Sequence, residues 1–305
     1  METQQLTIAM TIYNRYDFFE TAINSVINQT MRCPVLVLDN DSPHDKFEQY
    51  IKKLRNPLIT YIRNERNIGM VENMNKCIKT VKTPWITLLH DDDALHPQFV
   101  EKMVNAINTS DKIGLIAVRN LVNNKIPSEF FKPLPAEVPL KIIRKTYFMF
   151  RNLTPFPGTA FKTDIISRSG GFKEEDYPSY DIYLWYRMAS VTKVAIIDQV
   201  LAFYRISNQQ STFSVASSMV KQDIEFKQMV LKDNNIKSLF VQLGVEWAIQ
   251  HYVKTYASFY PNARKDILKL RSTRLTGYPL LDKIMYRLRD KYSYYKSIEE
   301  AIASD

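Results

Sequence analysis

The first 120 residues alternate between short apolar runs and segments in which apolar residues recur at helical spacing. The apolar runs that predict strands are Leu6 to Tyr13, Pro34 to Leu38, Leu58 to Arg63, Trp85 to Leu89 and Ile113 to Val118. Helical spacing covers Tyr16 to Gln29, Asp45 to Leu54 and Met70 to Val81, and Pro97 opens a further helix. Repeated alternation of this kind predicts an α/β fold, a mainly parallel sheet with helices on both faces.

Polar side chains follow three of the predicted strands. Asn14 and Arg15 come after the first strand, residues 39 to 41 (Asp-Asn-Asp) after the second, and residues 90 to 93 (His-Asp-Asp-Asp) after the fourth. Ligands of open α/β sheets bind at the carboxyl ends of the strands. We therefore expect the three clusters to line one ligand site.

The acidic cluster is the feature most closely tied to chemistry. Neighbouring carboxylates repel one another unless a cation joins them. Mg²⁺ and Mn²⁺ favour carboxylate oxygens together with substrate phosphate, so the cluster predicts a site for one of these metals. The alternative is a solvated acidic turn before the next helix, where Asp93 would interact favourably with the helix N-terminus.

The later chain divides into a less regular part and a helical part. Residues 121 to 150 carry four prolines and are interpreted as an insertion or lid. Thr154 to Thr163 predicts a strand, Asp181 to Ser190 a helix, and Val194 to Ile206 a short hairpin or strand pair. From about Ser217 only helical spacing remains, so residues 1–215 and 216–305 are expected to form an α/β domain and a C-terminal helical region.

Bulk properties narrow the setting. The 305 residues are 45% hydrophobic, which is enough for a sizeable core, and the net charge of +9 favours anionic partners. Cys33 and Cys77 belong to no metal or disulfide pattern and predict free thiols in a reducing compartment. With no signal-peptide core and no apolar run of ~18 residues, a cytoplasmic location is expected.

Six segments, taken in chain order, resemble the family-2 inverting glycosyltransferases of the GT-A fold. They are IAMTIYNRYDFFETAINSVINQT, VLVLDNDS, RNIGMVENMN, WITLLHDDDALHP, GGFKEEDYPSYDIYLWYRMA and YRISNQQST, and they span about residues 5 to 212. The resemblance implies transfer of a sugar from a nucleotide-diphosphate sugar, in particular a UDP-sugar, to an acceptor hydroxyl during surface-polysaccharide synthesis. It also implies a nucleotide-binding half over 1–120 and an acceptor-binding half over 121–215.

The same resemblance implies roles for individual residues. The expected nucleotide-sugar site comprises Thr11, Tyr13, Asn14, Arg15, Asp39, Asn67, Asp91 and Arg205. Within it, Asp39 is implied to recognise the uracil edge and Arg205 to clamp the diphosphate. Asp92 is implied to coordinate Mn²⁺ or Mg²⁺, with His90 and Asp93 as further candidate ligands. His90 departs from the family pattern, which has an aspartate at that position.

Asp181 matches the family's general base, which deprotonates the acceptor hydroxyl. The family's Glu-Asp pair is Tyr180-Asp181 here, and one carboxylate suffices as a base if it reaches the hydroxyl. From the residues alone, Asp181 is also a favoured helix N-cap. Gly170-Gly171, just upstream, predicts either a turn with positive φ or an ordinary helix stop.

The tail from Tyr278 to Lys296 is basic and amphipathic. It is interpreted either as an interfacial helix at anionic lipid on the inner face of the membrane, suited to a lipid-linked saccharide acceptor, or as a helix packed on the catalytic domain or on a second subunit. Packing is favoured because amphipathic helices usually face a protein core.

Three other functions compete with sugar transfer. A nucleotidyltransferase would show a glycine-rich loop after the first strand, where this chain has Tyr13-Asn14-Arg15. A non-catalytic nucleotide-sugar-binding protein would keep the same fold. A nucleic-acid binder would explain the positive charge but not the position of the carboxylates.

Overall fold

The computed structural model describes residues 1–153, 156–206, 212–260 and 262–270. The chain forms two compact units, one made of residues 1–145 with 152–210 and the other of residues 146–151 with 211–305.

Within the described residues, nine strands of the first unit form one sheet in the order β3-β2-β1-β4-β8-β6-β9-β5, with β7 paired to β9. The strands are β1 (Leu6–Ile12), β2 (Val35–Asp39), β3 (Ile59–Arg63), β4 (Trp85–His90), β5 (Ala94–Leu95), β6 (Ile113–Asn123), β7 (Leu140–Ile143), β8 (Ala160–Lys162) and β9 (Lys193–Arg205). The parallel pairings β1–β2, β1–β4, β2–β3 and β6–β9 include the longest ladders. The predicted α/β class with a mainly parallel sheet is confirmed.

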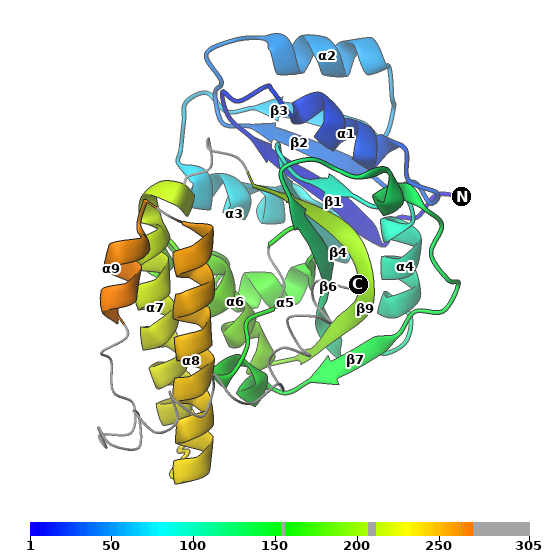
Figure 1. The fold of residues 1–305 in the computed structure, drawn as a ribbon. Helices are drawn as coiled ribbons and strands as arrows, with labels where there is room; N and C mark the ends of the chain where they lie inside the picture. Colours follow the sequence, from blue (N-terminus) through cyan, green and yellow to red (C-terminus); the bar gives the residue numbers. More distant parts are fainter. Residues whose placement is uncertain (154–155, 207–211, 261, 271–305) are drawn as a thin grey trace. The chain divides into compact units, whose positions relative to one another are not determined.

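Helices cover both faces of this sheet, and Figure 1 shows α1 and α3 on opposite sides of β1 and β2. The helices are α1 (Phe19–Ile27), α2 (Lys46–Leu54), α3 (Met70–Thr80), α4 (Phe99–Ile107), α5 (Thr163–Arg168) and α6 (Tyr180–Ala189), with 3₁₀ turns η1 (Ser128–Phe131), η2 (Lys145–Met149) and η3 (Glu174–Asp176). Alternate residues of β1, such as Ile8 and Met10, share one core with buried side chains of α1, α2 and α4. Burial of each such side chain stabilises the fold by about 1.5–3 kcal/mol.

Two predictions for the later part of this unit need correction. Residues 193–205 form one continuous strand, not a hairpin or strand pair, because β6 pairs along one side of β9 while β7 and then β5 pair along the other. The segment expected to be an insertion or lid instead contributes the end of β6, the turn η1 and strand β7. Of the strand expected over 154–163, residues 160–162 are extended.

The second unit is helical in its described part, as expected. It contains α7 (Thr212–Asp233), α8 (Leu239–Phe259) and α9 (Arg264–Lys269). Phe148 packs edge-on against Phe226, and Lys227 and Asp223 form a buried ion pair at 3.1 Å. Among the described helices, none is long and apolar enough to cross a bilayer. The basic segment Tyr278 to Lys296 lies outside the described residues.

Candidate active site

The turn after β1 places Tyr13, Asn14 and Arg15 at the carboxyl edge of the sheet. Asn14 adopts a left-handed conformation with φ of 58°, which asparagine tolerates better than most residues. Its N–H donates to Oγ of Ser42 at 2.9 Å, and Nε2 of His44 donates to its carbonyl at 3.0 Å. The turn is therefore fastened to the loop that follows β2, while the ring of Tyr13 stays 46% exposed.

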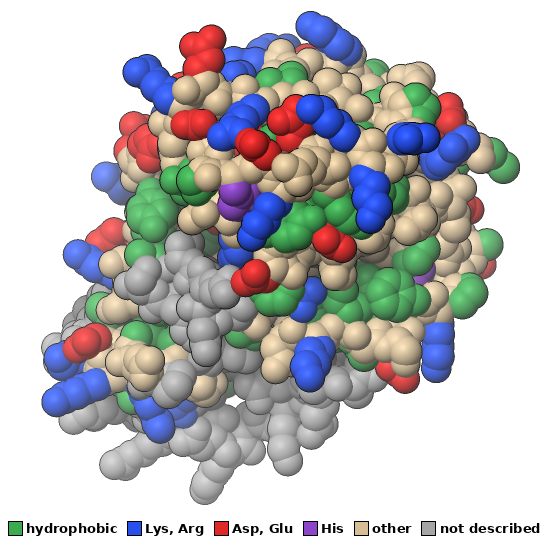
Figure 2. Space-filling view, turned by 90° about the horizontal axis from the view of Figure 1, so that it is seen from above, with side chains coloured by type: hydrophobic (Ala, Val, Ile, Leu, Met, Phe, Trp, Pro, Cys, Tyr) green, Lys and Arg blue, Asp and Glu red, His purple; other side chains and the backbone are tan. Residues whose placement is uncertain are grey.

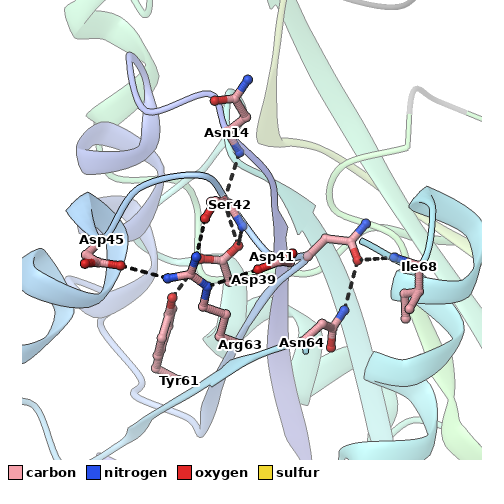
Figure 3. Close-up of polar contacts among 10 residues, drawn as sticks. Asn14, Asp39, Asp41, Ser42, Asp45, Tyr61, Arg63, Asn64 and Ile68 are labelled. Carbon is pink, nitrogen blue, oxygen red and sulfur yellow. Dashed lines mark hydrogen bonds and ion pairs between the residues drawn. The ribbon is translucent and has the colours of Figure 1, made fainter. Parts of the chain in front are cut away.

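Asp39 ends β2 and is completely buried. Oδ1 accepts hydrogen bonds from the backbone N–H and the hydroxyl of Ser42, at 2.9 and 2.6 Å, and Oδ2 accepts one from the hydroxyl of Tyr61 at 2.7 Å (Figure 3). Burial and the nearby carboxylate raise the pKa of Tyr61, so its hydroxyl keeps the proton that it donates. The carboxylate of Asp39 is therefore surrounded by neutral hydrogen-bond donors from Ser42 and Tyr61.

Arg63, at the end of β3, contacts three residues of the loop that follows Asp39 (Figure 3). Its guanidinium donates to Oδ1 of Asp45 at 2.8 Å and to the carbonyl of Ser42, and it lies 3.5 Å from Oδ1 of Asp41. Because these partners lie at three points along one loop, Arg63 fixes the path of the chain from 41 to 45 over Asp39.

Asn40 fastens the segment that contains Asn67. Its Oδ1 accepts from Asn64 Nδ2 at 2.9 Å and from the N–H of Ile68 at 3.0 Å. Its Nδ2 donates to Asn67 Oδ1 at 2.8 Å and to the carbonyl of Gly69 at 3.2 Å. The side chain of Asn67 is thus held against Asn40 at the carboxyl edge. Sequence reasoning did not assign roles to Ser42, Tyr61 or Asn40, although Asn40 lies inside the Asp-Asn-Asp cluster.

The acidic turn after β4 is buried at Asp91, Asp92 and Asp93. Arg15 donates to Oδ1 of Asp91, and its guanidinium lies 3.0 Å from Oδ2 of Asp92. Burial raises the pKa of Asp91 to about 7 and that of Asp93 well above its usual range. Oδ2 of Asp93 is buried without a hydrogen-bond partner, so one carboxyl oxygen of the turn is left unsatisfied.

Arg205, the last residue of β9, contacts this turn from a strand that is distant in sequence. Its backbone N–H donates to Oδ1 of Asp93 at 3.0 Å, and its guanidinium donates to the carbonyls of Asp92 and Asn124 at 2.7 and 2.9 Å. The guanidinium also lies 4.2 Å from the ring centroid of Phe18, and the residue is 6% exposed. These contacts hold the backbone of the acidic turn; the diphosphate role of Arg205 stays a prediction.

His90 and Thr11 face each other across the β1–β4 pairing. Thr11 Oγ1 lies 3.2 Å from Nδ1 of His90, and the imidazole stacks on Phe156 with centroids 4.9 Å apart. Burial lowers the pKa of His90, so the neutral ring is favoured. The imidazole of His90 is therefore a neutral ring packed between Thr11 and Phe156.

Asp181 lies in the first turn of α6, where its Oδ1 accepts from the N–H of Ile182 at 2.9 Å. A row of rings leads to it from the acidic turn: His90 stacks on Phe156, Phe156 packs on Phe172, and Phe172 contacts Tyr180, the neighbour of Asp181. Arg187 fixes the segment before α6 by donating to Asp176 Oδ2 at 2.5 Å and to the carbonyl of Gly171 at 2.8 Å. The first unit thus holds all the predicted site residues.

The donor atoms of the acidic turn suit a hard divalent cation. They are carboxylate oxygens, and one of them, Oδ2 of Asp93, is buried without a partner. Among the described residues, no three His, Cys, Asp or Glu side chains already surround a metal position. Mg²⁺ is usually held by one or two carboxylates plus substrate phosphates and not by a complete protein cage. The turn therefore fits a divalent metal that a substrate phosphate helps to coordinate.

A mainly parallel sheet with polar side chains after β1 and β2 and buried carboxylates after β4 defines an α/β protein with a candidate ligand site at the carboxyl edge of its sheet. The family model described as Glycosyl transferase family 2 matches residues 7–166, more than half of the chain. The protein belongs to the family 2 glycosyltransferases, as the six sequence segments predicted.

Individual relatives agree with this assignment. An uncharacterized glycosyltransferase of Methanocaldococcus jannaschii is 28% identical over 222 residues, which cover 70% of this chain and 75% of the relative. S. aureus TarS 1–349, solved in complex with UDP-GlcNAc, has a TM-score of 0.56 at 11% identity, over 93% of this chain and 92% of that solved chain. The mannosyltransferase PcManGT from Pyrobaculum calidifontis, solved with GDP-Man and Mn²⁺, has a TM-score of 0.56 at 15% identity, over 98% of this chain and 84% of that one. These two matches confirm the GT-A fold.

Proposed function

We propose that this glycosyltransferase transfers a sugar from a nucleotide-diphosphate sugar to an acceptor hydroxyl, with a divalent metal and with inversion at the anomeric carbon. The observation that carries the proposal is the buried carboxylate turn of residues 91–93, which follows β4. Strand β1 pairs with β4 on one side and with β2, which ends at Asp39, on the other. The turn after β1 is hydrogen-bonded to the loop after β2 through Asn14 and Ser42. Nucleotide-sugar complexes of structural neighbours with this fold, one of them containing Mn²⁺, support the choice of donor and metal.

Asp92 would hold the metal, assisted by Asp91 or Asp93. When bound, the metal offsets the negative charge that develops on the departing nucleotide diphosphate. Asp181 takes the proton of the acceptor hydroxyl, and the oxygen attacks the anomeric carbon from the face opposite the diphosphate. One displacement of this kind inverts the configuration.

The carboxylate of Asp39 favours binding of a base that presents an N–H donor, such as uracil. Each carboxylate oxygen has two acceptor positions, and Oδ2 of Asp39 accepts a single bond from Tyr61, which leaves room for a bond from the base. Contact with the base requires the side chains that cover Asp39 to shift. Cytosine presents an acceptor in place of the imide N–H, so UDP and dTDP should raise the melting temperature in the presence of Mn²⁺ and CDP should raise it less. Equal shifts by UDP and CDP would refute this role of Asp39.

The catalytic proposal is tested by comparing Asp181→Asn with the wild type. Loss of a general base should reduce sugar transfer about 10²–10⁴-fold while UDP binding is kept. Asp164→Asn, which removes an exposed carboxylate paired with Arg168, is the matched control and should transfer sugar normally. A folded Asp181→Asn protein that transfers sugar at the wild-type rate would remove Asp181 from the mechanism. Absence of both transfer and donor hydrolysis in the wild type, with UDP still bound, would favour a binding protein.

We further propose a saccharide or lipid-linked saccharide acceptor in surface-polysaccharide synthesis, at the cytoplasmic side of the membrane. The positive charge of the segment from Tyr278 to Lys296 supports this proposal, because an interfacial helix at anionic lipid is one of the two interpretations of that segment. Flotation with anionic liposomes should recover the full chain and not a chain ending at Ser272. Equal recovery of the two chains would remove the membrane role.

A further inference from the structure

Two arginines meet the acidic turn in different ways. Arg15 contacts the carboxylate side chains of Asp91 and Asp92, whereas the guanidinium of Arg205 donates to the backbone carbonyls of Asp92 and Asn124. The contacts of Arg205 leave the carboxylate oxygens of Asp91 and Asp92 available. The contacts of Arg15 use one oxygen of each carboxylate, Oδ1 of Asp91 and Oδ2 of Asp92, and a divalent cation would compete for these atoms.

The backbone of Arg15 is fixed while its side chain has room to change partners. Asn14 is bonded on one side to Ser42 and on the other to His44, and the N–H of Arg15 donates to the carbonyl of Tyr13 at 2.6 Å. The side chain of Arg15 is 24% exposed, compared with 7% for Asp91 and 5% for Asp92. Its Nε is buried without a hydrogen-bond partner. A phosphate oxygen would offer the guanidinium a partner as strong as the carboxylates that it now holds.

The buried carboxyl groups of the acidic turn explain why a positive charge is needed at the position of Arg15. Three consecutive buried carboxyl groups destabilise one another, and Arg15 is a cation in contact with two of them. Removing one partner of a buried charge pair leaves the other charge uncompensated, which is costly. A divalent metal that binds Oδ1 of Asp91 and Oδ2 of Asp92 without nucleotide must therefore displace Arg15 from both.

We propose that Arg15 is a built-in counter-cation that competes with the divalent metal for Asp91 and Asp92. The metal then binds tightly only together with the donor, whose diphosphate accepts the released guanidinium. This inference rests on the proposed function, because it requires a metal and a nucleotide diphosphate at the same site. In this proposal Arg15 couples the binding of the metal to that of the diphosphate. Because such coupling is reciprocal, each ligand raises the affinity for the other by the same factor.

The test is a Mn²⁺ titration followed by electron paramagnetic resonance, with and without UDP, on wild type, Arg15→Gln and Arg15→Lys. Without UDP, Arg15→Gln should bind Mn²⁺ about tenfold more tightly than the wild type, a change of about 1.4 kcal/mol. The factor by which UDP tightens Mn²⁺ binding should be smaller in Arg15→Gln. Arg168→Gln removes one positive charge from an exposed pair with Asp164 and should match the wild type.

A folded Arg15→Gln protein whose Mn²⁺ affinity without UDP equals that of the wild type overturns the proposal. Arg15→Lys keeps the charge but cannot bridge two carboxylates with a planar fork, so its Mn²⁺ affinity should lie between the other two. If Arg15→Gln does not fold, a wild-type Mn²⁺ affinity in Arg15→Lys overturns the proposal instead. No step of the test requires sugar transfer. Absence of Mn²⁺ binding in every protein, even with UDP, would overturn the metal site of the proposed function as well.

Discussion

The hydroxyl of Tyr61 on β3 donates a 2.7 Å hydrogen bond to the completely buried carboxylate of Asp39 on the neighbouring strand. Tyr61→Phe removes the donor and leaves Oδ2 of the buried Asp39 without this hydrogen bond. The free energy of unfolding, measured by urea denaturation, should therefore fall by about 1–3 kcal/mol. UDP affinity, measured by calorimetry, should fall as well because Asp39 loses its orientation.

Tyr50→Phe is the control for this variant, since the Tyr50 hydroxyl on α2 accepts a 3.2 Å bond from Asn24 on α1 and is not one of the hydrogen-bond donors to Asp39 that the structure describes. It should leave UDP affinity unchanged. A Tyr61→Phe protein with the wild-type unfolding free energy and UDP affinity would show that the hydroxyl does not support Asp39.

Asn40 uses both ends of its amide, and Asn40→Asp tests the donor end. The carboxylate cannot donate to Asn67 Oδ1 or to the carbonyl of Gly69, and it places a buried charge beside both acceptors. We expect the unfolding free energy to fall by about 3 kcal/mol. Asn28→Asp, at an exposed position after α1, should change it little. Equal stability of the two variants would contradict the network described for Asn40.

Gly170 and Gly171 form a matched pair for separating backbone strain from crowding. Both have positive φ, 83° and 62°, so alanine is strained at either position. A Cβ at Gly171 would lie 2.5 Å from Oδ1 of Asn75, whereas the nearest atom at Gly170 is Lys173 Cε at 3.7 Å. Gly171→Ala should therefore lower the unfolding free energy by at least about 1 kcal/mol more than Gly170→Ala.

Asn75 cannot yield easily to such a Cβ, because it exchanges two hydrogen bonds with the backbone of Phe172, at 2.8 and 2.9 Å. The displaced segment leads to Asp181, so sugar transfer should also slow in Gly171→Ala. If the two alanine variants unfold at the same urea concentration, the contact with Asn75 is not a constraint.

His96 predicts a pH dependence of stability. Its Nδ1 accepts from the N–H of Gln98 at 3.1 Å and its Nε2 lies 3.0 Å from the carbonyl of Lys132, so the neutral ring has one fitting tautomer. Burial lowers the pKa of His96 below its unfolded value of about 6.5. The stability from the neutral ring is thus present above about pH 6.5 and is lost as the pH falls toward the folded pKa.

Urea unfolding of the wild type and of His96→Asn at pH 7.5 and 5.5 measures this effect. The wild type should lose more stability on acidification, by up to about 1 kcal/mol, since the raised pKa values of Asp91 and Asp93 act in both proteins and cancel in the comparison. His44→Asn controls for the loss of a histidine. Parallel pH profiles of wild type and His96→Asn would refute the prediction.

Apart from β5, the elements of the first 120 residues were predicted, because each carries an apolar run or an apolar helix face. α1, α2 and α3 lie within the predicted ranges, and the acidic residues follow β4 as expected. β7 was not predicted, because its four residues follow a proline and become a strand only by pairing with β9. The continuity of β9 likewise depends on partners that are distant in sequence.

Within the site, sequence could place residues at strand ends but could not choose their partners. Asp39 was expected at the carboxyl edge, and its burial under Ser42 and Tyr61 depends on how the loop from 41 to 45 folds back. Arg15 and Arg205 were both assigned to the nucleotide sugar. Which arginine meets carboxylate side chains and which meets backbone carbonyls is a property of tertiary packing alone.

Strand β9 has a consequence for anyone who exchanges parts between members of this family. Its final residue, Arg205, holds the turn at 91–93, and Ala202 and Phe203 pair with Leu95 and Ala94. A chimera joined near residue 120 would combine an acidic turn from one parent with a brace shaped by the other. Segments on the two sides of residue 120 are therefore interleaved in one sheet, and a graft that preserves the acidic turn must carry β9 with the N-terminal strands.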